Sequence, residues 1–106
     1  MVNGLVPEGT NSHTFEPPPS SVATLETADI IFVNGMKLED PTLELAEANA
    51  PDAVICELGT ASLAEKDWLY DFSFPKEGGK PNPHLWTNPP SVMPYIKMIH
   101  DVLVKA

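Results

Sequence analysis

Cysteine, basic side chains and long apolar runs are all scarce in this chain of 106 residues. Its single cysteine, Cys56, cannot form an internal disulfide, and its place in the apolar run AVIC favours a small buried hydrophobe over a ligand or nucleophile. Six Lys and Arg residues stand against 15 Asp and Glu residues, which gives a net charge of -9. This balance argues against nucleic acid or an anionic membrane surface as a partner, because both are bound through clustered cations.

No apolar run is long enough to span a bilayer, and the first residues do not have the pattern of a signal peptide. Catalytic motifs are missing as well, since there is no Walker loop, no GxSxG elbow and no GxGxxG after a strand. Carboxylate pairs are expected by chance among 15 acidic residues. We therefore expect the protein not to be an enzyme. The enzymatic alternative is a metal-dependent hydrolase that activates water, but no well-placed general base supports it.

Proline, in contrast, is abundant, with 12 residues that lie mostly between apolar segments. Strands are predicted at residues 2–6, 29–34 and 53–58. The last two are near-continuous apolar runs, which is typical of strands covered on both faces of a sheet. Because strands alternate with helices over short links, the sequence predicts an α/β fold, a three-layer, mostly parallel sheet with flanking helices.

Three helices accompany these strands in the prediction. The first runs from residue 20 or 21 to about residue 28, and the second is capped by Asp40, with Pro41 at the first helical position. The last begins near Ser91, because Pro94 is tolerated only within a first turn. Its apolar stripe is expected to pack against the sheet and consists of Val92, Ile96, Ile99 and Leu103. Residues 68–70 fit either a strand or a helical turn.

Two histidines stand in Pro-bounded loops, and each is followed two positions later by an aromatic residue. The pairs are His13 with Phe15 and His84 with Trp86. Imidazole is the commonest side-chain metal ligand, and two imidazoles on rigid loops make half of a tetrahedral site. The aromatic residues would wall the loops and orient the rings. The third histidine, His100, lies on the flank of the last helix, where we assign it no role.

A resemblance supports this interpretation of the histidines. Residues 5–17, LVPEGTNSHTFEP, resemble the first ligand loop of the zinc/manganese-type (cluster A-I) solute-binding proteins of ABC transporters, which typically reads VPPGTDPHTYEPTPSD. Residues 28–35, ADIIFVNG, are similar to the family's ADLVFxNG, and residues 83–89, PHLWTNP, are similar to its second ligand motif, PHVWLDP. The match covers most of the chain, in order and with suitable spacing.

The resemblance implies two α/β lobes joined by one long rigid helix, with a metal ion in the cleft between them. By motif, two ligands fall on His13 and His84, and the others, a His or Glu and an Asp or Glu, come from the C-terminal lobe. Residues 1–106 would then be a single domain, an incomplete N-terminal lobe without its first strand and helix, and the C-terminal lobe would be absent. The implied function is extracytoplasmic capture of a divalent ion and its delivery to an ABC permease, in the periplasm or as a cell-surface lipoprotein.

The sequence departs from the family pattern in ways that leave zinc, manganese and iron all open. Asn11-Ser12 replaces Asp-Pro before His13, Asn88 replaces Asp, and no long His/Asp-rich loop precedes His84. An alternative interpretation is an adhesion or protein-interaction module without a transport role, because the family includes proteins described as adhesins. A sheet that lacks a strand would expose an unpaired edge, so we also expect self-association of this chain into a homo-oligomer.

Overall fold

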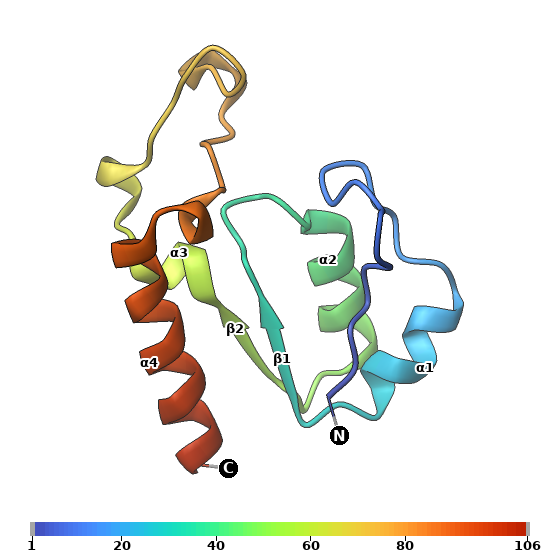
Figure 1. The fold of residues 1–106 in the computed structure, drawn as a ribbon. Helices are drawn as coiled ribbons and strands as arrows, with labels where there is room; N and C mark the ends of the chain where they lie inside the picture. Colours follow the sequence, from blue (N-terminus) through green and yellow to red (C-terminus); the bar gives the residue numbers. More distant parts are fainter. Residues whose placement is uncertain (1, 106) are drawn as a thin grey trace.

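The computed structural model describes residues 2–105, and it places a small parallel sheet between two groups of helices (Figure 1). The elements are α1 (Ser20–Glu26), β1 (Ile30–Val33), α2 (Asp40–Asn49), β2 (Val54–Glu57), α3 (Leu58–Ser62) and α4 (Pro89–Lys105), with the short 3-10 helices η1 (Glu65–Asp67), η2 (Lys76–Gly78) and η3 (Leu85–Thr87). The two strands pair in parallel, with Ile30 opposite Val54 and Val33 opposite Glu57. The predicted α/β class and the parallel pairing are confirmed.

The core lies on the face of the sheet that α1 and α2 cover. Side chains alternate between faces along a strand, so Ile31 and Val33 of β1 point to the same side, and both are buried. They pack into one cluster whose other buried members come from α1 and the α2 region, Leu25, Ala46 and Ala50. This cluster fixes β1, and with it the loop that follows β1 at its carboxyl end.

The prediction that the second and third predicted strands, which are β1 and β2 of the structure, are covered on both faces is wrong. Phe32, on the opposite face of β1 from the core, is 36% exposed, and Val54 of β2 is 52% exposed. Helix α4 packs against α3 and η3 rather than across β1 (Figure 1). The apolar run of β1 was therefore read correctly as a strand but not as a doubly covered one.

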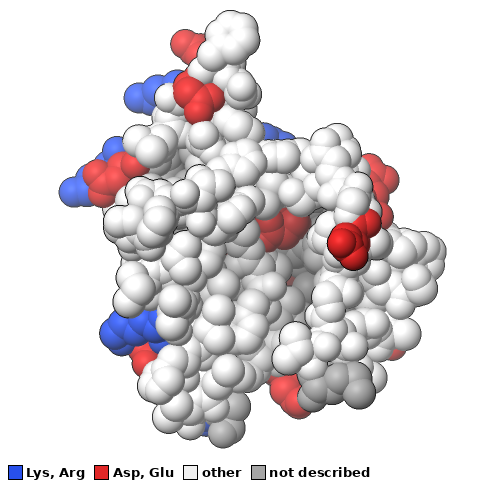
Figure 2. Space-filling model, viewed as in Figure 1, with Lys and Arg blue, Asp and Glu red and all other residues white. Residues whose placement is uncertain are grey.

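The strand predicted at residues 2–6 is also absent, since these residues form no ladder and the sheet described here has two strands, β1 and β2. Gly4 weakens a strand interior, and residues 2–6 do not pair with the free edge of β1 in the described structure. Residues 2–6 instead line a groove of about 650 Å³ together with all of β1, Leu25 and Leu103. This groove corresponds to the hollow in the space-filling view (Figure 2).

Helix α4 differs from its prediction at its start and on its apolar face. It begins at Pro89, two residues before Ser91, so Pro94 lies beyond the first turn. The carbonyl oxygen of Pro90 then has no N–H partner one turn later, which an exposed helix surface tolerates because water can reach it. Two residues of the predicted stripe are largely exposed, Ile96 and Leu103, at 54% each.

Between α3 and α4 the chain forms a long loop that projects from the sheet (Figure 1). Residues 68–70 adopt neither of the two conformations predicted for them, because they are irregular and follow η1. The return arm of this loop is anchored by Pro81 and Pro83, whose side chains are fully buried. Among residues 2–105, no helix has both the length and the apolar character needed to cross a membrane.

Candidate metal site

His13 is presented by two consecutive turns in the N-terminal segment. The first turn is closed by the Thr10 N–H, which donates to the Pro7 carbonyl at 3.1 Å, and the second by the Thr14 N–H, which donates to the Asn11 carbonyl at 3.2 Å. The Asn11 side chain adds an Asx turn, since its Oδ1 accepts from the His13 N–H at 3.0 Å. The imidazole of His13 is therefore carried on a compact, exposed loop.

His84 is presented in the same way, by an asparagine two positions before it. The Asn82 Oδ1 accepts from the His84 N–H at 3.0 Å. A second contact comes from the end of β1, where the Asn34 Nδ2 donates to the Pro83 carbonyl at 3.1 Å. The hydroxyl of Tyr95 in α4 donates in turn to the Asn34 Oδ1. The His84 loop is thus tied both to the carboxyl end of the sheet and to α4.

The structure brings the two predicted ligands together although they are 71 positions apart in the sequence. The Nε2 atom of His13 lies 2.9 Å from the Nε2 atom of His84. The ring centroids are 4.9 Å apart and the planes are tilted by 51°. Both rings therefore direct the nitrogen that usually binds metal toward one point.

The proton positions in this pair follow from the partner of the second ring nitrogen of His84. Its Nδ1 lies 2.7 Å from the Asn82 Oδ1, which can only accept a hydrogen bond, so Nδ1 carries the proton. In the neutral ring this leaves the lone pair on Nε2 of His84. The His13 Nε2–H then donates across the 2.9 Å contact. His84 is accordingly set in the tautomer that a metal ligand needs.

Two aromatic rings lie against the His13–His84 pair. Phe74, from the projecting loop, has its ring centroid 5.6 Å from that of His13 and 5.6 Å from that of His84. Trp86 lies against His84 at 5.1 Å, as expected from the sequence. Phe15, which was expected to play the same part for His13, makes no ring contact with either imidazole among the described residues. Phe74 takes its place.

Two ionisable groups near the loop after β1, Glu39 and Tyr95, have pKa values that burial raises. Burial raises the pKa of Glu39, against hydrogen bonds from the backbone of Gly35 and Asn34 that lower it. The Gly35 N–H donates to Glu39 Oε1 at 2.7 Å. Burial likewise raises the pKa of the Tyr95 hydroxyl, and the charge of Glu39 adds to this shift. These groups brace the loop after β1 and do not reach the imidazole pair.

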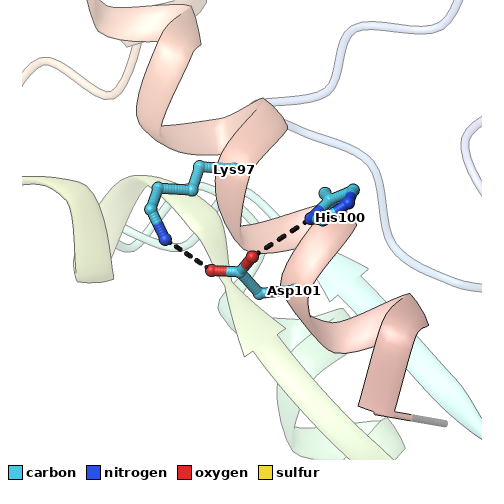
Figure 3. A network of polar contacts seen from close by, with 3 residues as sticks. All are labelled: Lys97, His100 and Asp101. Carbon is cyan, nitrogen blue, oxygen red and sulfur yellow. Dashed lines mark hydrogen bonds and ion pairs between the residues drawn. The ribbon is translucent and has the colours of Figure 1, made fainter.

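Within the described residues, no group of three or more His, Cys, Asp or Glu side chains comes together as a potential metal site. The pair therefore offers two ligands of a coordination shell. His100 is remote from it, on α4, where its Nδ1 lies 3.1 Å from Asp101 Oδ1 and Lys97 pairs with the same carboxylate at 2.6 Å (Figure 3). The hydrogen bond from Lys97, followed by that from His100, lowers the pKa of Asp101. Cys56 is partly rather than fully buried.

The sequence singles out both histidines of this candidate site, but it does not point to Asn82, to Phe74, or to Asp71, whose carboxylate accepts a hydrogen bond from the Asn82 side chain. A local signal for the first of these exists, because both histidines stand two positions after an asparagine, in Asn11-Ser12-His13 and Asn82-Pro83-His84. An asparagine at that spacing favours an Asx turn that fixes the histidine backbone. Phe74 and Asp71 carry no such signal, since they reach the site only through the return of the projecting loop.

Comparison with known proteins gives one family and a set of relatives. The family described as "Zinc-uptake complex component A periplasmic" matches residues 1–106. The manganese-binding lipoprotein MntA of Halalkalibacterium halodurans is 32% identical over 108 residues, which cover 98% of this chain and 32% of that protein. The iron-binding protein YfeA of Yersinia pestis is 29% identical over 107 residues, 99% of this chain and 32% of that protein.

A third relative is named for manganese and for its transporter class. The manganese ABC transporter substrate-binding lipoprotein PsaA of Streptococcus anginosus is 31% identical over 111 residues, 97% of this chain and 34% of that protein. The chain thus spans about a third of the length of these relatives. No solved structure has significant similarity to the chain.

Proposed function

Because this chain belongs to the family of the periplasmic component A of zinc-uptake complexes, we propose that it captures a divalent metal ion for an ABC transporter, with His13 and His84 as two of the ligands. The observation that carries the proposal is the 2.9 Å separation of their Nε2 atoms. Two imidazoles on one tetrahedral ion at ordinary bond lengths have nitrogens roughly 3.3 Å apart. A small opening of the pair, with the ring proton of His13 moved from Nε2 to Nδ1, would admit an ion without rebuilding either loop.

The chemistry of the surroundings supports the same role. A ligand imidazole must be neutral and must present a lone pair, and His84 already donates its other ring proton to Asn82. Phe74 and Trp86 limit the approach of water from two sides. The net charge of -9 favours cations near the protein. Capture of this kind needs no catalytic step, and the relatives named above are binding proteins rather than enzymes.

The finer features of the function are proposals that rest on the relatives. We propose zinc or manganese as the ion, with iron as the third candidate, because relatives are named for manganese and iron and the family for zinc. Imidazole suits all three metals. We further propose that ligands beyond the pair come from parts of a longer protein outside residues 1–106. That protein would act outside the cytoplasm, as a periplasmic protein or a lipoprotein, and would deliver the ion to a permease.

Native mass spectrometry of the chain with added zinc tests the ligand assignment. We expect one ion to bind to the unsubstituted chain and to be lost from His13→Ala and from His84→Ala. His100→Ala is the matched control, since it removes an imidazole that is remote from the pair, and it should keep the ion. The same spectra report whether a second copy fills the remaining positions of the shell. An unchanged ion count in His13→Ala or in His84→Ala would contradict the assignment.

Acidification provides a second test of the same proposal. A protonated imidazole has no lone pair for a metal, so zinc affinity should fall as the solution is acidified. Zinc binding should in turn displace protons from the imidazoles. Calorimetric titrations in two buffers of different ionisation enthalpy measure that proton release. Binding that is independent of pH would argue for carboxylate ligands in place of the imidazoles.

A further inference from the structure

Asp71 is an exposed carboxylate on the projecting loop that receives three hydrogen bonds on its two side-chain oxygens. Its Oδ2 accepts from the Asn82 Nδ2 at 2.9 Å. Its Oδ1 accepts from the backbone N–H groups of Ser73 and Phe74, at 2.9 and 3.0 Å. An exposed acidic side chain is ordinarily solvated and mobile, so three hydrogen bonds to one exposed carboxylate indicate a structural role.

The first of these contacts reaches toward His84. Because the Asn82 Nδ2 donates to the carboxylate, the Asn82 Oδ1 must face the other way, where it accepts from both the N–H and the Nδ1–H of His84. An amide with no such restraint could turn over and exchange its oxygen for its NH2 group. Asp71 therefore fixes the orientation of Asn82 together with the His84 N–H, and Asn82 fixes the tautomer of His84.

The second set of contacts reaches toward the aromatic wall. The side-chain bonds to Ser73 and Phe74 close a tight turn, which is also held by the Asp71 N–H to the Phe74 carbonyl at 2.9 Å and by the Phe74 N–H to the Asp71 carbonyl at 3.2 Å. This turn determines where the Phe74 ring lies, and the ring contacts both imidazoles.

We propose that Asp71 is a positioning residue of the candidate metal site, which holds His84 in its ligand tautomer through Asn82 and holds Phe74 against both imidazoles. The inference rests on the proposed function only where it concerns metal affinity. The Asn82 hydrogen bond lowers the pKa of Asp71, with the backbone N–H groups of Phe74 and Ser73 acting in the same direction, so the carboxylate is the form that these contacts favour.

Asp71→Asn is the sharpest substitution, because it turns one acceptor oxygen into a donor. The new side chain can keep its oxygen on the N–H groups of Ser73 and Phe74, but its NH2 then faces the NH2 of Asn82. Turning the Asn82 amide over relieves this conflict, gives up the hydrogen bond from the His84 N–H, and puts an NH2 group against Nδ1 of His84. The ring proton then belongs on Nε2, where it blocks the lone pair. Asp71→Ala removes the restraint without creating this conflict.

The test is NMR of the chain labelled with 15N in histidine and without added metal, in which long-range proton–nitrogen couplings report the tautomer of each ring. We expect an Nδ1–H tautomer for His84 in the unsubstituted chain and a shift toward Nε2–H in Asp71→Asn, larger than in Asp71→Ala. Asp67→Asn is the matched control, since it removes the same charge from the same loop at a position with no side-chain hydrogen bond in the described structure, and it should change nothing.

The double variant Asp71→Asn/Asn82→Asp supplies a rescue. A carboxylate at position 82 accepts from His84 and from the amide at position 71, so every hydrogen bond of the original arrangement is available again. We expect the Nδ1–H tautomer to return. An unchanged tautomer in Asp71→Asn, or a shifted tautomer that the double variant fails to restore, would overturn the inference.

Zinc titrations of the same proteins separate this inference from the proposed function. Loss of a partner behind a metal-binding histidine typically costs 10–100-fold in affinity, so a weakening of about that size is expected in Asp71→Asn and not in Asp67→Asn. If the tautomer of His84 changes as expected in the variants but the unsubstituted chain binds no zinc, the metal proposal fails and the positioning role stands. If zinc binds equally to all variants while the tautomer shifts, Asp71 does not contribute to affinity and that part of the inference fails.

Discussion

At the residue scale, Glu39 is a carboxylate whose ionised form is destabilised by folding. Burial raises its pKa, and the negative charges of Asp40 and Glu57 add to the shift. A carboxyl group with a raised folded-state pKa binds its proton more tightly in the folded chain than in the unfolded one. Its contribution to stability is therefore present at acidic pH and is lost as the pH rises from the ordinary value of 4.5 through the raised one.

Glu39→Gln should therefore flatten part of the pH dependence of stability. The amide keeps an oxygen for the Gly35 N–H and cannot ionise, so the difference in unfolding free energy between variant and parent should grow in favour of the variant as the pH rises from about 4 to about 7. Urea denaturation at several pH values measures this difference. Glu26→Gln removes the same charge from an exposed position on α1 and should leave the slope unchanged. A slope in Glu39→Gln equal to that of the parent would contradict the assignment.

The residues of the site differ in how far the sequence could identify them. His13 and His84 were identifiable because each lies in a recurring motif of consecutive residues. Asp71, Phe74 and Asn82 act on His84 through contacts that form only when the projecting loop folds back, and such contacts leave no pattern of spacing. Local motifs thus predict the proposed ligands, whereas the residues that support them depend on the tertiary path of the chain.

At the element scale, the turn after β1 depends on glycine. Gly35 has φ of 75°, and Met36 and Lys37 follow with φ of 52° and 64°. A Cβ atom at Gly35 would clash with Thr60 Oγ1, which accepts a hydrogen bond from the Met36 N–H at 2.7 Å. This loop connects the carboxyl end of β1 to α2, so its conformation also sets the position of Asn34.

Gly35→Ala is expected to destabilise the protein by about 2 kcal/mol or more, from the left-handed backbone and from the displaced Thr60. Chemical denaturation provides the measurement. Gly78→Ala is the control, since an added Cβ there meets nothing within 4 Å. Its effect should stay within about 0.5 kcal/mol. Equal effects of the two substitutions would mean that the turn after β1 is not constrained as described.

Helix α4 carries a proline that it would be more stable without. Pro94 lies six residues into the helix and has no N–H to donate to the Pro90 carbonyl. Pro94→Ala should stabilise the fold by about 1–3 kcal/mol, seen as a higher denaturant midpoint. Pro90→Ala is the comparison, because an N–H in the first turn has no partner within the helix, and it should change the midpoint little. A destabilised Pro94→Ala would indicate that the ring itself packs.

The elements that sequence periodicity predicted well are those whose neighbours lie close in the chain. α1, β1, α2 and β2 alternate with short links, and each has an apolar pattern of its own. The strand expected at residues 2–6 was wrong because a strand forms only by pairing with another segment, and a local apolar pattern does not reveal whether that pairing occurs. The face of α4 was misjudged for a related reason, since only tertiary packing on α3 and η3 decides which side is covered.

At the scale of the whole molecule, the main feature is the excess of negative over positive charge. The chain has 15 acidic and six basic residues, and acidic side chains are spread over the visible face (Figure 2). Mutual repulsion of like charges lowers the stability of a compact state and is screened by salt. The exposed Lys97–Asp101 pair acts in the opposite sense, but water and salt weaken the attraction within an exposed pair.

Raising the salt concentration from about 10 mM to about 150 mM shortens the screening length from about 30 Å to about 8 Å, and should raise the melting temperature. Scanning calorimetry with sodium chloride and with choline chloride, both with a chelator present, measures this effect. The two salts should act equally if screening is the cause. A rise with only one of them would point to bound ions instead.

The separation of His13 and His84 by 71 positions would give an ion bound as proposed a structural role as well. An ion held by both imidazoles would cross-link segments near the two ends of the chain, as a removable counterpart of the disulfide that a single cysteine cannot form. A protease that cut the projecting loop would then produce two fragments that the ion holds together in addition to the packing of α3 on α4. Loss of the ion would remove this cross-link and leave only the non-covalent contacts between the fragments.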